Sequence, residues 1–202
     1  MKSITGKVIA LTGASSGIGR SLATNFAQQG AHLALTDINE TGLKETASMI
    51  GTHTKITTHI VNVADREQVH QWADDVVKEH GVVDAIINNA GVASSGDIDE
   101  VELKDFQWTM DINLMGVVKG CHYFTPLLKK SRGNLINVAS MAGLLHMSGM
   151  SAYNASKAAV VALSETLYSE LDPHGVKVSV LCPAFFKTNL IFSKLGSRIF
   201  SN

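Results

Sequence analysis

The chain has 202 residues, of which 45% are hydrophobic and 17% charged, and its formal net charge is −1. This composition is typical of one globular domain with a substantial core and argues against a disordered chain. The near-neutral charge without a basic stripe argues against nucleic-acid binding, and no apolar run reaches the length of a membrane span.

Short apolar, β-branched segments alternate with longer amphipathic segments along the chain. The predicted strands cover residues 7–12, 32–36, 55–63, 84–88, 134–140 and 176–182. The predicted helices cover residues 17–29, 40–50, 66–80, 103–130 and 152–171. This alternation is the signature of βαβ units, and the nearly continuous apolar strands indicate a sheet covered on both faces. We predict one Rossmann-like domain over 1–202, with a doubly wound parallel sheet in a three-layer α/β/α arrangement.

The two cysteines, Cys121 and Cys182, lie in apolar surroundings and lack the spacing of a redox or metal-binding motif. We interpret them as free thiols of a protein in a reducing compartment. The apolar stretch after Lys2 is too short for a signal peptide and fits a strand better. The sequence therefore predicts a cytoplasmic protein. The eight histidines are scattered, so no metal site is predicted.

The sequence TGASSGIG, residues 12–19, lies between the first predicted strand and the first predicted helix. Its glycines, Gly13, Gly17 and Gly19, permit a tight turn, a close approach of the backbone to phosphate, and packing of the helix on the strand. The helix N-terminus adds free N–H groups and the positive end of its dipole. In this position the motif predicts a dinucleotide site rather than an empty structural turn.

Asp37 ends the second predicted strand, eighteen residues after Gly19. A carboxylate there can accept hydrogen bonds from both hydroxyls of an adenosine ribose. It would also repel a 2′-phosphate, and neither Ser15 nor Ile38 supplies a compensating cation, so NAD is predicted in preference to NADP. The alternatives for Asp37 are a solvated acid and the N-cap of the next helix.

The sequence YNASK, residues 153–157, places Tyr153 and Lys157 on one face near the start of the last predicted helix. An ammonium about 4 Å from a phenolate is worth roughly 4 kcal/mol at an effective dielectric of 20, enough to lower the phenol pKa by up to about 3 units. Ser140, at the end of the preceding predicted strand, could hold a substrate oxygen beside the phenol. The alternative for Tyr153 and Lys157 is an exposed pair on the helix surface without a catalytic role. The alternative for Ser140 is a hydroxyl that only makes hydrogen bonds with local backbone groups. Ligands bind at the carboxyl ends of parallel strands, so the position favours catalysis.

Together with NNAG at 88–91 and with Asn113, these motifs resemble in order and spacing the short-chain dehydrogenase/reductase family, in its TGxxxGxG branch. The resemblance implies an NAD-dependent oxidoreductase that interconverts a secondary alcohol and a ketone. It implies that Tyr153 is the general acid/base and that Lys157 lowers its pKa and holds the nicotinamide ribose. It further implies that Ser140 orients the substrate oxygen and that Asn113 holds a water of a proton relay. The implied cofactor-binding residues are Gly13, Ser15, Ser16, Gly17, Ile18, Gly19, Asp37, Asn62, Val63, Asn89, Ala90, Gly91, Tyr153, Lys157, Pro183 and Thr188.

The sequence departs from the family pattern at three places. Asn62 stands where the family usually has an aspartate near the adenine, and its amide can still make that hydrogen bond. Ala184 replaces a glycine after Pro183, which reduces backbone freedom beside the nicotinamide. Family members usually continue with a substrate lid, another helix and a last strand, which are expected to be absent after residue 202. A homodimer or homotetramer is expected, although part of the usual tetramer contact involves that region.

Segments 141–150 and 184–192 are apolar and rich in methionine and phenylalanine. As borders of the pocket they favour a hydrophobic small-molecule alcohol or ketone, although such residues also serve as simple packing. His146 could touch this substrate. Two other functions stay open. One is an epimerase or dehydratase on the same scaffold, although the short glycine turn argues against it. The other is a non-catalytic NAD-binding regulator or scaffold.

Overall fold

A computed structural model describes residues 3–52 and 54–184 of the chain. Within these residues, six parallel strands form one sheet in the order β3-β2-β1-β4-β5-β6. The strands are β1 (Val8–Thr12), β2 (His32–Asp37), β3 (Ile56–Ile60), β4 (Ala85–Asn88), β5 (Asn134–Val138) and β6 (Lys177–Leu181). The chain order reverses between β1 and β4, which is where doubly wound sheets open a ligand crevice.

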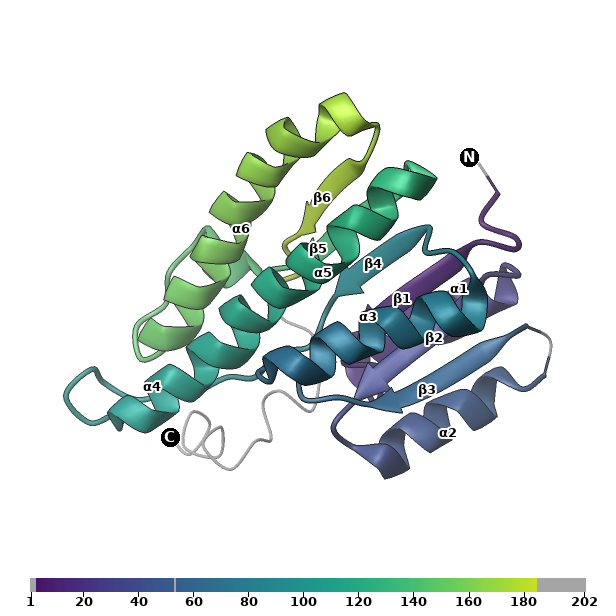
Figure 1. Cartoon of the computed structure of the whole chain (residues 1–202). Helices are drawn as coiled ribbons and strands as arrows, with labels where there is room; N and C mark the ends of the chain where they lie inside the picture. The colour runs from purple at the N-terminus through teal and green to yellow at the C-terminus, as the bar shows by residue number, and fades with distance from the viewer. Residues whose placement is uncertain (1–2, 53, 185–202) are drawn as a thin grey trace.

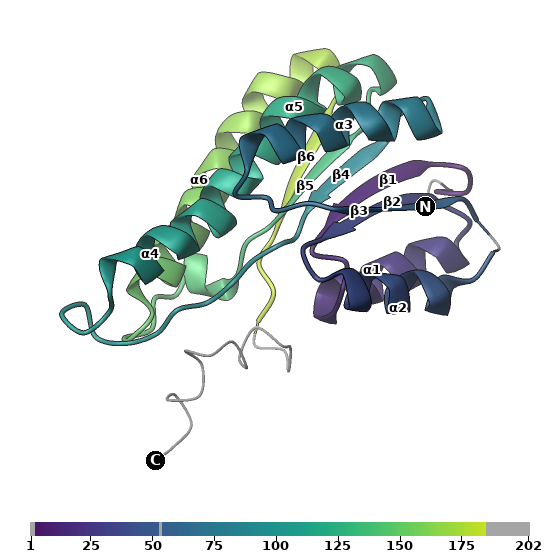
Figure 2. The ribbon, with the colours of Figure 1, turned by 60° about the horizontal axis from the view of Figure 1, so that its bottom comes forward.

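Helices cover both faces of the sheet, as Figures 1 and 2 show. On one face lie α1 (Gly17–Gln28) and α2 (Glu40–Ile50). On the other lie α3 (Arg66–His80), α5 (Gly116–Ser131) and α6 (Ser151–Leu171). The predicted doubly wound α/β/α fold is therefore confirmed. No helix among the described residues has both the length and the apolar character needed to cross a bilayer.

The alternation of side chains along each strand divides the core into two layers. In β1, Val8 and Ala10 belong to the cluster that includes Trp72 of α3 and Phe124 of α5. The intervening residues of β1 belong to a second cluster, together with side chains of α1 and α2. Because both faces are covered, β1 is buried along its whole length, as its continuous apolar sequence predicts.

The predicted helix over 103–130 is wrong in one respect, because an irregular turn divides it. The chain forms α4 (Leu103–Met110), then a π-helical turn (Asp111–Met115), and then α5. At that turn the Gly116 N–H donates to the Asp111 carbonyl, five residues earlier. The predicted strand over 55–63 is also too long, because β3 ends at Ile60.

Candidate active site

Two glycines of the turn between β1 and α1, Gly13 and Gly19, have no space for a β-carbon. Gly13 and Gly17 have φ angles of 70° and 52°, which favour glycine. A β-carbon on Gly19 would lie 2.0 Å from the Gly13 carbonyl oxygen, and one on Gly13 would lie 2.8 Å from the Ala90 Cα. The turn is thus compact because its glycines are in direct backbone contact with their surroundings.

The N-terminus of α1 differs from those of the next two helices. Asn39 and Asp65 cap α2 and α3 by accepting hydrogen bonds from backbone N–H groups, and both helices carry a glutamate in their first turn. The Ser16 side chain makes no such bond, and the first turn of α1 has no acid. The positive end of α1 is therefore left for an anion, as a dinucleotide pyrophosphate requires. Ser15 and Ser16 precede α1 and Ile18 lies in its first turn; their contact with a cofactor stays a prediction.

Asp37 lies beside the same turn. Its carboxylate accepts hydrogen bonds at 3.0 Å from the backbone N–H groups of Ser15 and Asn39. Asn39, not Asp37, caps α2, so the N-cap interpretation of Asp37 is wrong. The guanidinium of the nearby Arg20 donates hydrogen bonds to the Ser15 carbonyl and to groups of α2, including the Glu45 carboxylate at 2.9 Å.

The NNAG segment after β4 ties the glycine turn to the rest of the site. The Asn89 amide donates to the carbonyls of Thr12 and Gly13, at 2.9 and 3.2 Å. The backbone N–H groups of Asn89 and Ala90 donate to the Thr12 hydroxyl. Sequence reasoning did not place Thr12 among the site residues, although its position at the start of the motif was the available signal.

Gly91 continues this segment toward the candidate catalytic side chains. A β-carbon on Gly91 would lie 3.3 Å from Asn113 Oδ1 and 3.5 Å from Lys157 Nζ. The fold thus brings together residues from the segment after β4, the π-helical turn and α6, which are far apart in the sequence.

Tyr153 and Lys157 lie in α6, and both are buried. Lys157 Nζ is 5.7 Å from the centroid of the Tyr153 ring and donates a 2.9 Å hydrogen bond to the Val138 carbonyl at the end of β5. The interpretation of these residues as an exposed Tyr–Lys pair is therefore wrong. Ser140, two residues after β5, accepts a hydrogen bond from the Ala142 N–H and is hydrogen-bonded to Tyr153.

Burial governs the pKa values of this pair. It raises the pKa of Tyr153, while the hydrogen bond with Ser140 acts in the opposite direction. It lowers the pKa of Lys157 to about 8, with the Cys182 thiol acting in the opposite direction. The expected lowering of the Tyr153 pKa is wrong for the protein chain by itself, because loss of hydration outweighs the hydrogen bond with Ser140.

Asn113 lies in the π-helical turn and is fully buried. Its Oδ1 accepts from the Val92 N–H, and its Nδ2 donates to the Val92 carbonyl, both at 2.8 Å. Nδ2 also lies 3.2 Å from the Ser156 hydroxyl in α6. Asn113 therefore holds the segment after NNAG against α6, and its role with a relay water stays a prediction.

The remaining predicted cofactor residues lie at other strand ends. Asn62 and Val63 follow β3, and Val63 is buried against Gly116. The Pro183 carbonyl accepts from the Met141 N–H and so links the end of β6 to the segment after Ser140. Thr188 and the predicted apolar segment beyond Ala184 lie outside the described residues.

The doubly wound sheet and the uncapped N-terminus of α1 at the switch point define the class of the protein, a Rossmann-like α/β protein. A family model described as short chain dehydrogenase matches residues 7–195, and the chain belongs to that family.

Individual relatives share this similarity over different lengths. Oxidoreductase SadH of Mycobacterium tuberculosis is 41% identical over 194 residues, which cover 93% of this chain and 70% of SadH. Oxidoreductase EphD of the same organism is 38% identical over 187 residues, which cover 91% of this chain. The match spans only 32% of EphD, about a third of its length. A short-chain dehydrogenase/reductase from Burkholderia phymatum, solved in complex with NAD, has a TM-score of 0.92 at 37% identity. That match covers 96% of this chain and 71% of the other.

Proposed function

We propose that the chain is an NAD-dependent dehydrogenase/reductase that interconverts a hydrophobic secondary alcohol and a ketone. The observation that carries the proposal is the buried pair of Tyr153 and Lys157, with the half-buried Ser140 beside Tyr153 and Gly91 beside Lys157. A phenol hydrogen-bonded to a serine hydroxyl, with a buried amine behind it, suits proton exchange with an alcohol or carbonyl oxygen. The naming of SadH and EphD as oxidoreductases supports the same class of reaction.

In this proposal, Tyr153 exchanges a proton with the substrate oxygen, and the Ser140 hydroxyl donates a hydrogen bond to that oxygen. Lys157 stabilises the phenolate when charged, and its bond to the Val138 carbonyl fixes the position of Nζ. Bound NAD⁺ supplies the hydride acceptor and a positive charge that also favours the phenolate. Asn113 holds the neighbouring segment in place and is proposed to support a proton relay.

Three features support NAD as the cofactor. The glycine turn offers the uncapped N-terminus of α1 to the pyrophosphate. Asp37 presents a carboxylate where the adenosine ribose hydroxyls are expected. The guanidinium of Arg20 is bonded to α2 and to the glycine turn, so it does not offer a free cation to a 2′-phosphate. The NAD-bound neighbour from Burkholderia phymatum supports the same choice.

The segment between Ser140 and α6 supports a hydrophobic substrate. Leu144, Leu145 and Met147 are 52%, 65% and 45% exposed, on the segment that follows the catalytic serine. The segment is held at its far end, where the Asn154 amide donates to the Met147 carbonyl at 2.7 Å. Anchored apolar side chains at this edge favour an apolar ligand over a charged one. His146, also exposed, is a candidate for contact with the substrate.

We also propose an oligomeric state and a cellular compartment for the protein. Exposed apolar side chains on the helices, such as Trp108, Met115 and Tyr168, favour a homodimer or homotetramer. The free thiols of Cys121 and Cys182 favour a reducing compartment, and hence the cytoplasm. The alternative function is a non-catalytic NAD-binding regulator, which would bind the dinucleotide without turnover.

The test is the near-ultraviolet absorbance of reduced nicotinamide, followed with NAD⁺ or NADP⁺ over a panel of hydrophobic secondary alcohols. Tyr153→Phe should lower kcat by about 10²–10⁴-fold, because general acid/base catalysis is lost, while NADH binding is retained. Tyr168→Phe on the same helix is the matched control and should behave like the wild type, since that ring is 56% exposed. NADH binding without oxidation of any alcohol would favour the regulator, and a fully active Tyr153→Phe would overturn the assignment of the acid/base.

A further inference from the structure

A chain of three buried polar side chains crosses the core from β4 to α6. Asn88 Nδ2 donates to Asn137 Oδ1 at 2.9 Å, and Asn137 Nδ2 donates to the Ser164 hydroxyl at 3.0 Å. Ser164 in turn donates to the Val160 carbonyl within its own helix. All three side chains are at most 2% exposed. The three residues, called the amide chain below, come from β4, β5 and α6.

Apolar residues of similar size would fill this space without the desolvation of two amides, so the directional bonds need an explanation. The surrounding core is apolar and includes Phe124, Leu135 and Val160. Both roles of the Ser164 hydroxyl are used, as donor to Val160 and as acceptor from Asn137. The amide chain therefore specifies one arrangement of α6 on the sheet.

One row of side chains on the buried face of α6 is short, with Ala152, Ser156, Val160 and Ser164 at intervals of four residues. The larger buried side chains of α6 include Tyr153, Lys157 and Leu171. Short side chains make shallow ridges, which resist sliding and rotation of a helix less than large ones do. The directional hydrogen bond at Ser164 adds a restraint to this row.

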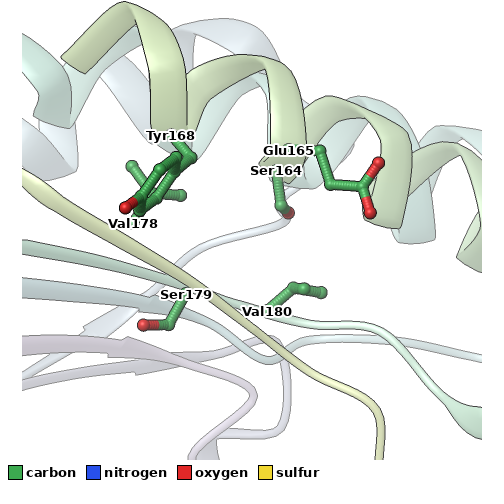
Figure 3. Close-up of a pocket in the computed structure, with 6 residues that line it drawn as sticks. All are labelled: Ser164, Glu165, Tyr168, Val178, Ser179 and Val180. Carbon is green, nitrogen blue, oxygen red and sulfur yellow. The ribbon is translucent and has the colours of Figure 1, made fainter. Parts of the chain in front are cut away.

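The amide chain is connected to Lys157 through β5 and α6, and to the glycine turn through β4. Asn137 immediately precedes Val138, whose carbonyl accepts the bond from Lys157 Nζ. Ser164 lies two helical turns after Lys157, about 10 Å along the axis. Helix α6 is thus attached to β5 at two separate points. At the other end, Asn88 is followed by Asn89, which holds the glycine turn. Figure 3 shows Ser164 directed from α6 toward the strands, next to the groove that Tyr168, Val178 and Val180 line.

We propose that Asn137 and Ser164 are positioning residues, which fix the register of α6 on the sheet and thereby hold Lys157 and Tyr153 against the cofactor turn. This inference rests on the proposed roles of Tyr153 and Lys157. A displacement of about 1 Å at a reacting group can reduce turnover by about 10²-fold, so the register of this helix matters to catalysis.

The test compares Ser164→Ala with Thr166→Ala. Both hydroxyls donate to the carbonyl four residues earlier in α6, but only Ser164 also accepts from another element. The first measurement is the pKa of Lys157, from NMR of isotope-labelled lysine side chains, with no cofactor or substrate added. Ser164→Ala should raise it from about 8 toward the ordinary value of about 10.4, because a displaced Lys157 gains water. Thr166→Ala should leave it unchanged.

The second measurement is steady-state kinetics with an alcohol that the wild type oxidises. Ser164→Ala should lower kcat by about tenfold with little change in KM, because the acid/base pair is displaced while the substrate and cofactor surfaces persist. An unchanged Lys157 pKa in Ser164→Ala would overturn the inference, whatever the turnover. If no alcohol is oxidised but the pKa moves as expected, the positioning role stands and the proposed reaction fails.

Discussion

Replacing Gly19 with alanine tests how closely α1 must approach the glycine turn. Gly19 is inside a helix and has no left-handed backbone angle, so alanine would normally stabilise this position by about 1 kcal/mol. Here the added β-carbon would lie 2.0 Å from the Gly13 carbonyl oxygen and 2.8 Å from Asn89 Nδ2. The first of these neighbours is backbone and cannot rotate away.

The expected result is a net loss of stability. Overpacking of this kind costs about 1–3 kcal/mol, which outweighs the gain in helix propensity. The Gly13 carbonyl also accepts a bond from Asn89, so its displacement disturbs the NNAG segment as well as the turn. Because the pyrophosphate is expected to lie on this backbone, NADH affinity should fall at least tenfold, equal to about 1.4 kcal/mol.

The assay is urea unfolding, combined with titration of NADH fluorescence. Ser21→Ala is the matched control, since Ser21 is exposed on the same helix and its replacement should be neutral or slightly stabilising. Wild-type stability together with wild-type NADH affinity in Gly19→Ala would refute the reasoning that close backbone contact defines this site.

Two further predictions concern cofactor choice and pH. Asp37→Ser should weaken NADH binding by about tenfold or more and improve NADPH binding, because a charge-assisted bond is lost and a repulsion removed; an unchanged preference in parallel titrations would show that Asp37 does not select the cofactor. Burial lowers the pKa of His80, whose Nδ1 has no hydrogen-bond partner among the described residues. The neutral imidazole therefore contributes stability that is present above the unfolded value of about 6.5 and is lost as the pH falls below it. His80→Gln should flatten the dependence of the urea midpoint on pH in this range, and an equally steep dependence would count against this origin.

The sequence predicts the fold and the cofactor turn well, because both depend on local chemistry. Glycines at fixed spacing between a strand and a helix have few structural uses, and the structure puts Gly13 and Gly19 in contact across the turn. The place of Asp37 beside this turn follows in the same way from its position at a strand end. Thr12 is less visible in the sequence, because its contacts are with a segment more than seventy residues away.

The pairing of Tyr153 with Lys157 is predicted by their spacing, but its electrostatics are not. Spacing alone gives an attraction between an ammonium and a phenolate. The structure adds the burial of Tyr153, which raises its pKa and so reverses the expected direction. The amide chain is likewise not predictable from the sequence, because Asn137 and Ser164 stand there as isolated polar residues in apolar segments.

The π-helical turn between α4 and α5 contains one residue more than regular helical turns would hold. Deleting a single residue there would give one continuous α-helix, and the α4 segment would rotate by about 100° about the axis relative to α5. The buried side of α4, which includes Thr109, would then turn away from its contact with Ser94. The extra residue thus determines which side chains of α4 face the protein interior. A family alignment that places its gap elsewhere in this helix would assign the wrong residues to the protein interior.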